Sequence, residues 1–180
     1  MTKMGNVARL GAHVAAAAAH GADIIVFSEG ALGIASFNYL DKKTNQTHGD
    51  GGGVASGELA EEIPDPRTAS QTELNACTDP KAPAATPALH AISCFAKQYN
   101  ITIVLDMGDK QPCSTYPYSP NVTCSECPPE GVFRFNSQVA IGNDGRYICL
   151  LVSCCCHHCL LSIWCCCHCH PRFLYFRTCT

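Results

Sequence analysis

A carboxylate directly follows an apolar segment that is typical of a buried strand. The segment is "ADIIVFS", residues 22–28, and Glu29 comes next, before the small residues of "GALGIAS". Open α/β sheets bind their ligands at the carboxyl ends of their strands, and Glu29 would lie at such an end. Burial there would raise the pKa of the carboxyl group and make Glu29 a general base near neutral pH. A solvated glutamate that begins a surface turn is the plainer alternative.

Cysteine is the second reactive residue type that stands out, and its fifteen copies fall into two groups. Six are spaced between Cys77 and Cys149, and nine are crowded between Cys154 and Cys179. The spacing of the first group is typical of structural disulfides, although six cysteines allow many pairings. The sequence alone therefore predicts disulfides without fixing their connectivity.

Three sequons for N-linked glycosylation accompany the spaced cysteines, and they begin at Asn45, Asn100 and Asn121. Sequons together with spaced cysteines favour the oxidising secretory route. The first residues, "MTKMGNVARLGAHVAAAAAHGAD", lack the apolar core and cleavage site of a signal peptide. We therefore expect a secreted or extracellular protein whose signal peptide is absent from this chain.

The segments around Glu29 alternate between helix and strand patterns. Apolar residues at helical spacing predict a helix over residues 4–20 that ends at Gly21, and residues 22–28 predict a strand buried on both faces. Residues 41–87 are rich in Gly, Pro, Asp and Ser, which favours a long surface insertion.

A second helix–strand pair follows the insertion. Thr86 as N-cap and a proline at the first helical position predict a helix over residues 86–100, followed by a buried strand at 101–107. Residues 108–131 have the composition of turns. Helix followed by buried strand, twice, indicates an α/β fold.

A hairpin is predicted near the end of this pattern. Residues 132–142 alternate like a half-buried strand, "NDG" at 143–145 is a turn signal, and the partner strand should begin at Arg146 and Tyr147.

The composition of the chain changes abruptly after the hairpin, because residues 151–180 contain no Gly, Asp, Glu or Lys. We therefore divide the chain into a domain at 1–147 and a Cys/His-rich tail at 148–180.

The Cys/His-rich tail supports several interpretations. Cys and His are zinc ligands, but adjacent cysteines cannot all face one tetrahedral ion, so we predict no metal site. Cysteines beside apolar residues could mark a lipidated, membrane-surface segment. Our preferred interpretation is that the tail is non-native or disordered sequence, such as a frame change would produce.

Size and charge narrow the function classes. The 180 residues fit one domain, and a net charge of −3 with 15% charged residues argues against a nucleic-acid partner. No run of about 18 apolar residues predicts a membrane span, so a membrane anchor is not expected within this chain.

Several short motifs follow one another along the chain. They are "GADIIVFSEGALGIASFN" at 21–38, "IPDP" at 63–66, "NAC" at 75–77, "ISCFAK" at 92–97, "GDKQPC" at 108–113 and "CPPEGVFRFNSQVAIGNDGRY" at 127–147. In order and approximate spacing they resemble the nitrilase (carbon-nitrogen hydrolase) superfamily, and in particular its biotinidase and vanin (pantetheinase) branch, and the resemblance extends from residue 5 to 147.

The resemblance implies an αββα sandwich and an amidase with a Glu-Lys-Cys triad, without a cofactor. The thiolate attacks an amide carbonyl, the Glu transfers protons and the Lys stabilises the oxyanion. Glu29 matches the Glu, but the Lys and Cys expected after Tyr147 are not found, and no lysine follows Lys110. Ser28 also replaces the usual proline, and the first strand of the family is missing. We therefore expect a partial sandwich that is inactive as it stands.

The resemblance also suggests how some cysteines pair. Cys113 and Cys127 would bracket one loop, Cys77 and Cys94 would tie the insertion to the second helix, and Cys124 could be a free thiol. The implied partner is a small-molecule amide substrate, and the resemblance allows a homodimer. Two other hypotheses remain, a non-catalytic secreted binding glycoprotein and a metal-binding protein that uses the tail.

Overall fold

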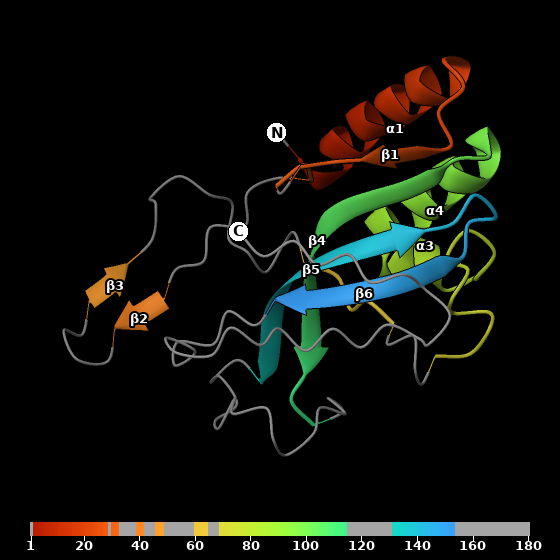
Figure 1. Cartoon of the computed structure of the whole chain (residues 1–180). Coiled ribbons are helices and arrows are strands. Elements are labelled where there is room, and N and C mark those ends of the chain that lie inside the picture. Colours follow the sequence, from red (N-terminus) through yellow and green to blue (C-terminus); the bar gives the residue numbers. More distant parts are fainter. Residues whose placement is uncertain are drawn as a thin grey trace.

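The computed structural model describes residues 2–28, 30–32, 39–41, 46–48, 60–64, 69–114 and 131–153. Figure 1 shows their arrangement. The helices and strands are α1 (Lys3–Ala19), β1 (Ile24–Val26), β2 (Tyr39–Asp41), β3 (Gln46–His48), α3 (Ala82–Ala85), α4 (Pro87–Tyr99), β4 (Thr102–Pro112), β5 (Val132–Ile141) and β6 (Tyr147–Ser153).

Four strands form one mixed sheet in the order β1-β4-β5-β6. Strand β1 runs parallel to β4, with Ile25 opposite Ile103, whereas β5 is antiparallel to both β4 and β6. Helix α4 contacts β4 and β5 and packs against α1. Figure 1 shows α3 and α4 behind the sheet. Helices against a mixed sheet confirm the predicted α/β class.

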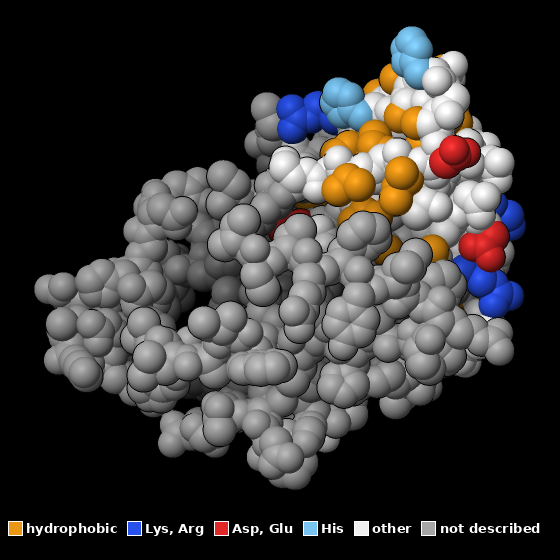
Figure 2. Space-filling model, viewed as in Figure 1, with side chains coloured by type: hydrophobic (Ala, Val, Ile, Leu, Met, Phe, Trp, Pro, Cys, Tyr) orange, Lys and Arg blue, Asp and Glu red, His pale blue; other side chains and the backbone are white. Residues whose placement is uncertain are grey.

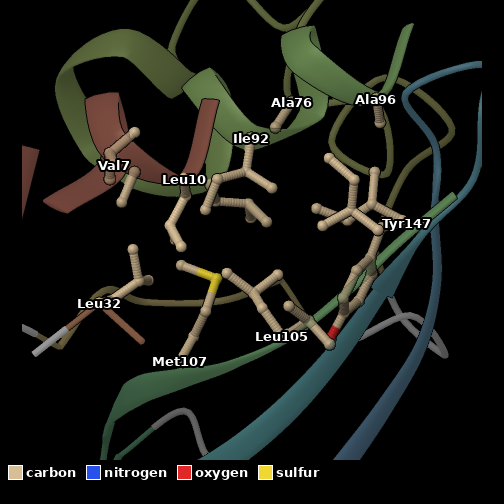
Figure 3. Packing of buried hydrophobic residues seen from close by; sticks show 14 of the residues in the cluster. Val7, Leu10, Leu32, Ala76, Ile92, Ala96, Leu105, Met107 and Tyr147 are labelled. Atoms are coloured by element: carbon tan, nitrogen blue, oxygen red, sulfur yellow. The ribbon is translucent and has the colours of Figure 1, made fainter. Parts of the chain in front are cut away.

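The hydrophobic core lies between these helices and one face of the sheet. Alternate residues of β4 point into it, and Ile103, Leu105 and Met107 are at most 1% exposed. Figure 3 shows Val7 and Ile92 of the two helices facing Leu105 and Met107 of the strand. Burial of these side chains removes apolar surface from water, which is the main favourable term in folding.

The opposite face of the sheet is open at β1. Ile24 and Val26 are 54% and 62% exposed, and Figure 2 shows hydrophobic side chains gathered along this strand. The prediction that residues 22–28 are buried on both faces is therefore wrong. Among the described strands β1 lies at the edge of the sheet, and Ile25 and its neighbour Phe27 pack against the core.

Both predicted helices and the hairpin are confirmed. The Thr2 hydroxyl accepts a hydrogen bond from the N–H of Gly5 at the start of α1, and the chain leaves the helix through Gly21 at φ 78°. At the hairpin, the N–H of Gly142 donates to the carbonyl of Arg146 at 2.7 Å, and β6 begins at Tyr147.

Strand β4 is longer than the sequence predicts. The segment 108–112 was expected to be a turn because of its polar residues, but it continues the strand, with Asp109 opposite Phe135 and Pro112 opposite Val132. Pairing with β5 supplies the backbone hydrogen bonds, which outweighs the weak strand preference of Gly, Asp and Lys.

The segment 41–87 is more than a surface insertion. Ile63, Ala76 and Ala82 are 1%, 4% and 3% exposed and belong to the core. Glu61 bridges in parallel to Asp109 of β4, so the sheet gains a short extra contact there. The low hydrophobicity of the whole segment concealed these few anchoring residues.

Strand β6 extends past the predicted boundary near residue 148, since it continues to Ser153. The remainder of the Cys/His-rich tail, 154–180, lies outside the described residues. Within the described ranges, no helix is both long and apolar enough to cross a membrane.

Candidate active site

Glu29, the predicted catalytic carboxylate, lies outside the described residues, but both of its neighbours are described. The N–H of Phe27 donates to the carbonyl of Val104 at 2.9 Å, which continues the β1–β4 pairing beyond Val26. Ser28 and Gly30 follow, and Gly30 has a φ of 74°, which favours glycine. The strand is therefore followed by a turn that includes Gly30.

The turn after β1 is anchored on two sides. The N–H of Gly30 donates to Oδ2 of Asp106 in β4 at 3.4 Å. The carbonyl of Leu32 accepts a buried hydrogen bond of 2.8 Å from Nδ2 of Asn6 in α1, and Asn6 in turn accepts one from Arg9. Gly30 and Leu32, which both follow position 29, are thus tied to the sheet and to the helix layer respectively.

Asp106 lies on the open side of the sheet. Its neighbours along β4, Leu105 and Met107, point into the core, and side chains alternate along a strand. The half-buried Asp106 carboxylate is therefore on the face that bears Ile24 and Val26. The carboxyl end of β1 therefore lies beside one half-buried carboxylate, that of Asp106.

A second carboxylate, Glu61, is buried to 2% exposure at the N-terminus of α4. Its Oε1 accepts hydrogen bonds from the N–H of Ala88 and from Nζ of Lys3, both at 2.8 Å. Its Oε2 accepts the N–H of Leu89 at 3.0 Å. A helix N-terminus favours an anion, so these contacts identify Glu61 as a structural residue that caps α4.

Thr86 occupies the predicted N-cap position of α4, but its side chain makes no capping hydrogen bond. Glu61 provides that function instead. Sequence reasoning missed this role because it considered only residues adjacent to the helix. No local pattern links Glu61 to this helix, because the Ala88 and Leu89 N–H groups that it binds lie 27 and 28 residues away in the sequence.

Asp109 is a third carboxylate, and it is 1% exposed. Its Oδ1 accepts the N–H of Ile63 at 3.1 Å and the Nε2 of Gln111 at 2.7 Å. Gln111 also donates to the carbonyl of Ile63 at 2.8 Å. Asp109 thus fastens the segment 60–64 to β4, and it too was missed in the sequence, where it was assigned to a turn.

One of the implied disulfides is present. Cys77 and Cys94 are joined, which ties the segment before α3 to helix α4. The Nε2 of His90 lies 4.0 Å from Sγ of Cys94. Cys113 is also disulfide-bonded, and Cys127, its expected partner, lies outside the described residues. That second pairing stays a prediction, as does the free thiol at Cys124.

The structure describes one of the three predicted glycosylation sites. Asn100 is exposed at the end of α4, whereas Asn45 and Asn121 lie outside the described residues. In the described part of the chain, no group of His, Cys, Asp and Glu side chains could hold a metal ion. The tail cysteines and histidines are not among those residues.

Comparison with known proteins gives consistent matches. The chain is 39% identical to a pantetheinase of Mus musculus over 88 residues, which are 49% of this chain and 15% of that protein. It is 34% identical to a biotinidase of Takifugu rubripes over 134 residues, or 74% of this chain and 22% of the relative. A pantetheinase of Canis lupus familiaris is 31% identical over 143 residues, or 79% and 23%.

No family model matches the chain. These three relatives are nevertheless all pantetheinases or biotinidases, the branch that the sequence motifs resemble. The chain spans less than a quarter of the length of these relatives. The chain belongs to the pantetheinase and biotinidase family, and the similarity covers between 49% and 79% of its residues.

Proposed function

We propose that this chain is part of an amide hydrolase in which Glu29 acts as general acid and base. The observation that carries the proposal is the turn after β1. Its residues Ser28 and Gly30 follow a strand paired with β4, and Gly30 is hydrogen-bonded to Asp106. The similarity to pantetheinases and biotinidases gives the reaction class, the hydrolysis of a linear amide in a small molecule.

Glu29 would need two partners for that reaction. A thiolate must attack the carbonyl carbon, and a cation must stabilise the oxyanion that forms. After Tyr147 the sequence has no lysine, and its cysteines are Cys149 and the nine crowded ones between Cys154 and Cys179. Because the members of a triad act as a unit, we propose that the chain alone does not turn over such amides.

The open sheet face supports the sandwich architecture that the resemblance implies. Ile24 and Val26 expose apolar surface that a second sheet would cover in an αββα sandwich. The relatives are several times longer than the matched segment, so further chain is available in proteins of this family. We also propose secretion, on the basis of the Cys77–Cys94 disulfide and the sequons.

A chimaera tests the assignment of Glu29 directly. The matched segment of this chain replaces the aligned segment of the canine pantetheinase, and hydrolysis of pantetheine and of biotinyl amides is measured. We expect turnover in the chimaera and a loss of about 10³-fold or more in kcat for Glu29→Gln. An active Glu29→Gln chimaera would contradict the proposal.

Glu62→Gln is the matched control, since Glu62 is exposed and undergoes the same chemical change. It should leave kcat unchanged. The isolated chain is assayed in parallel. Turnover by that chain, abolished by Glu29→Gln, would retain the role of Glu29 and refute the proposed inactivity.

A further inference from the structure

The Cys77–Cys94 disulfide has an imidazole beside one of its two sulfurs. His90 and Cys94 lie one turn apart on helix α4, where residues four apart are neighbours, and Nε2 of His90 is 4.0 Å from Sγ of Cys94. The other sulfur, that of Cys77, belongs to the segment before α3. The two sulfurs of one bond therefore have different surroundings.

A backbone carbonyl fixes the orientation of the His90 ring. Its Nδ1 lies 2.7 Å from the carbonyl oxygen of Ala76. A carbonyl only accepts hydrogen bonds, so Nδ1 carries the proton and Nε2 of the neutral ring presents a lone pair. The carbonyl of Cys77 also lies 3.8 Å from Sγ of Cys94, but it cannot take the proton of a thiol. Nε2 of His90 can do so.

The disulfide lies at the border between the core and solvent. Cys77, Cys94 and His90 are all half-buried, and Thr78, directly after Cys77, is exposed. Thiol–disulfide exchange begins when a thiolate from solution reaches one of the two sulfurs. We therefore expect small thiols to react with the folded chain.

Hydrogen bonds hold the segment around Cys77 independently of the disulfide. The N–H of Cys77 donates to the Ser93 hydroxyl at 2.9 Å, and this hydroxyl donates to the carbonyl of Gly145 at 2.6 Å. The N–H of Tyr147 donates to the carbonyl of Leu74 at 2.8 Å. Opening of the disulfide breaks none of these bonds, so the two sulfurs should stay close to each other and to the imidazole.

We propose that Cys77, Cys94 and His90 form a redox-active thiol site, which a dithiol opens by attack on Cys77 while His90 takes up the proton. The attacking thiol gives its proton to Nε2 of His90, and its sulfur forms a bond with Sγ of Cys77. The Cys77–Cys94 bond breaks, and its electron pair goes to Sγ of Cys94, beside the imidazolium. A thiolate next to a cation is the better leaving group, which directs the attack to Cys77.

The second thiol of the dithiol completes the exchange. Its sulfur displaces Sγ of Cys77 and closes a disulfide within the reductant, and its proton goes to Cys77. The dithiol loses two electrons, and the two cysteines gain them. The reduced site then holds a thiol at Cys77 and a thiolate beside His90 at Cys94. This chemistry depends neither on Glu29 nor on the hydrolysis of amides.

The direction of opening is tested with glutathione, a monothiol whose mixed disulfide with the protein can be trapped by acid. The full oxidised chain is treated with glutathione near neutral pH, quenched, blocked with N-ethylmaleimide and digested with trypsin. Cleavage after Lys81 places Cys77 and Cys94 in separate peptides, 68–81 and 82–97, each with one cysteine. We expect glutathione on Cys77 in about tenfold excess over Cys94. Equal amounts, or an excess on Cys94, would overturn the proposal.

A matched pair of variants tests the role of the imidazole. His90→Asn removes the base but keeps an N–H for the carbonyl of Ala76. The excess on Cys77 should disappear in this variant, and the disulfide should open about tenfold more slowly. His13→Asn makes the same change at an exposed histidine of α1 and should alter neither result. An undiminished excess in His90→Asn would overturn the proposal.

Attack on the folded chain has its own readout, which needs no variant. The rate of opening should rise in proportion to the glutathione concentration. After reduction with dithiothreitol, the amide of Tyr147 should keep its protection from hydrogen exchange, because its bond to Leu74 remains. Either a rate that levels off at high glutathione or a loss of this protection would show that unfolding precedes attack, and would overturn the proposal.

Discussion

Glu61 accepts a hydrogen bond of 3.0 Å from the backbone N–H of Leu89, 28 residues away in sequence. The same carboxylate binds the N–H of Ala88 and the ammonium of Lys3, so it joins the N-termini of both long helices. Its own backbone pairs with Gly108 and Lys110 of β4. One buried charge therefore connects the helix layer to the sheet.

Glu61→Gln should lower the free energy of unfolding by about 2–4 kcal/mol. Glutamine keeps the shape but loses the charge, and its NH₂ group would face donors rather than acceptors. Urea denaturation of the purified chain measures the change. Glu62→Gln, on the exposed neighbour, should shift stability by less than about 0.5 kcal/mol. Equal shifts for the two variants would refute the capping role.

Removal of the Cys77–Cys94 disulfide should also destabilise the domain, by about 3 kcal/mol. The bond closes a loop with a sequence separation of 17 residues, and its loss increases the entropy of the unfolded chain. We expect the Cys77→Ala/Cys94→Ala double variant to unfold at a lower urea concentration than the wild type.

Two hydrogen bonds of the Ser93 hydroxyl are the alternative explanation for the stability of the segment around Cys77. The N–H of Cys77 also bonds to the hydroxyl of Ser93 at 2.9 Å, and that hydroxyl donates to the carbonyl of Gly145 at 2.6 Å. If these contacts alone hold the loop, the double variant will have the same denaturation midpoint as the wild type. Ser93→Ala in each background then measures their separate contribution.

The parts of the fold that could be predicted are those fixed by local patterns. Helical spacing and Gly21 predict α1, and "NDG" predicts the β5–β6 hairpin, because periodicity and turn residues act over a few positions. The extension of β4 to Pro112 could not be predicted in this way. It depends on pairing with β5, whose residues are distant in the sequence.

The site was predictable only in part for the same reason. The end of β1 follows from its apolar run, but the hydrogen bond from Gly30 to Asp106 spans 76 residues. The cap on α4 likewise comes from Glu61, not from Thr86 beside it. Long-range polar contacts have no periodicity in the sequence, so pattern reasoning misses them.

Gly11 should not tolerate alanine. A Cβ at this position of α1 would lie 2.6 Å from Cζ of Phe95 in α4, which is well inside contact distance. The strain should cost about 1–3 kcal/mol and outweigh the gain of about 1 kcal/mol in helix propensity. Gly5→Ala, exposed in the same helix, is the control: its Cβ would meet only Oγ1 of Thr2 at 3.1 Å, so the gain in helix propensity should offset the displacement of that hydroxyl and leave stability little changed.

A double-mutant cycle identifies the cause. In a Phe95→Leu background the ring is absent, so Gly11→Ala should become neutral or stabilising. The same loss of stability in both backgrounds would show that the α1–α4 contact is not responsible.

Glu73 should titrate at an unusually low pH. Its carboxylate accepts the N–H of Ser70 at 2.7 Å, and the Ser70 hydroxyl accepts the N–H of Glu73 at 3.2 Å, as in a capping box. The backbone N–H of Ser70, and after it the Ser70 side chain, hold the pKa of Glu73 below its usual range. Because the folded pKa is depressed, the contribution is present above the unfolded pKa and is lost as pH falls through the folded pKa.

Carbon-detected NMR of the side-chain carboxyl groups measures this pKa. Ser70→Ala removes the hydroxyl bond and should raise the pKa of Glu73 toward that of an unstructured peptide. An identical titration of Glu73 in both proteins would refute the side-chain contribution of Ser70.

Asp106 should position the turn that follows β1. In the chimaera with canine pantetheinase, Asp106→Ala removes the acceptor for the N–H of Gly30, and we expect kcat to fall about tenfold because the turn is less well placed. Asp106→Asn keeps an oxygen at the same place and should restore most of the rate. Loss of the carboxylate charge would act differently, since both variants would then lose activity alike. A tenfold loss in Asp106→Asn as well as in Asp106→Ala would therefore assign the effect to the charge and refute positioning through Gly30.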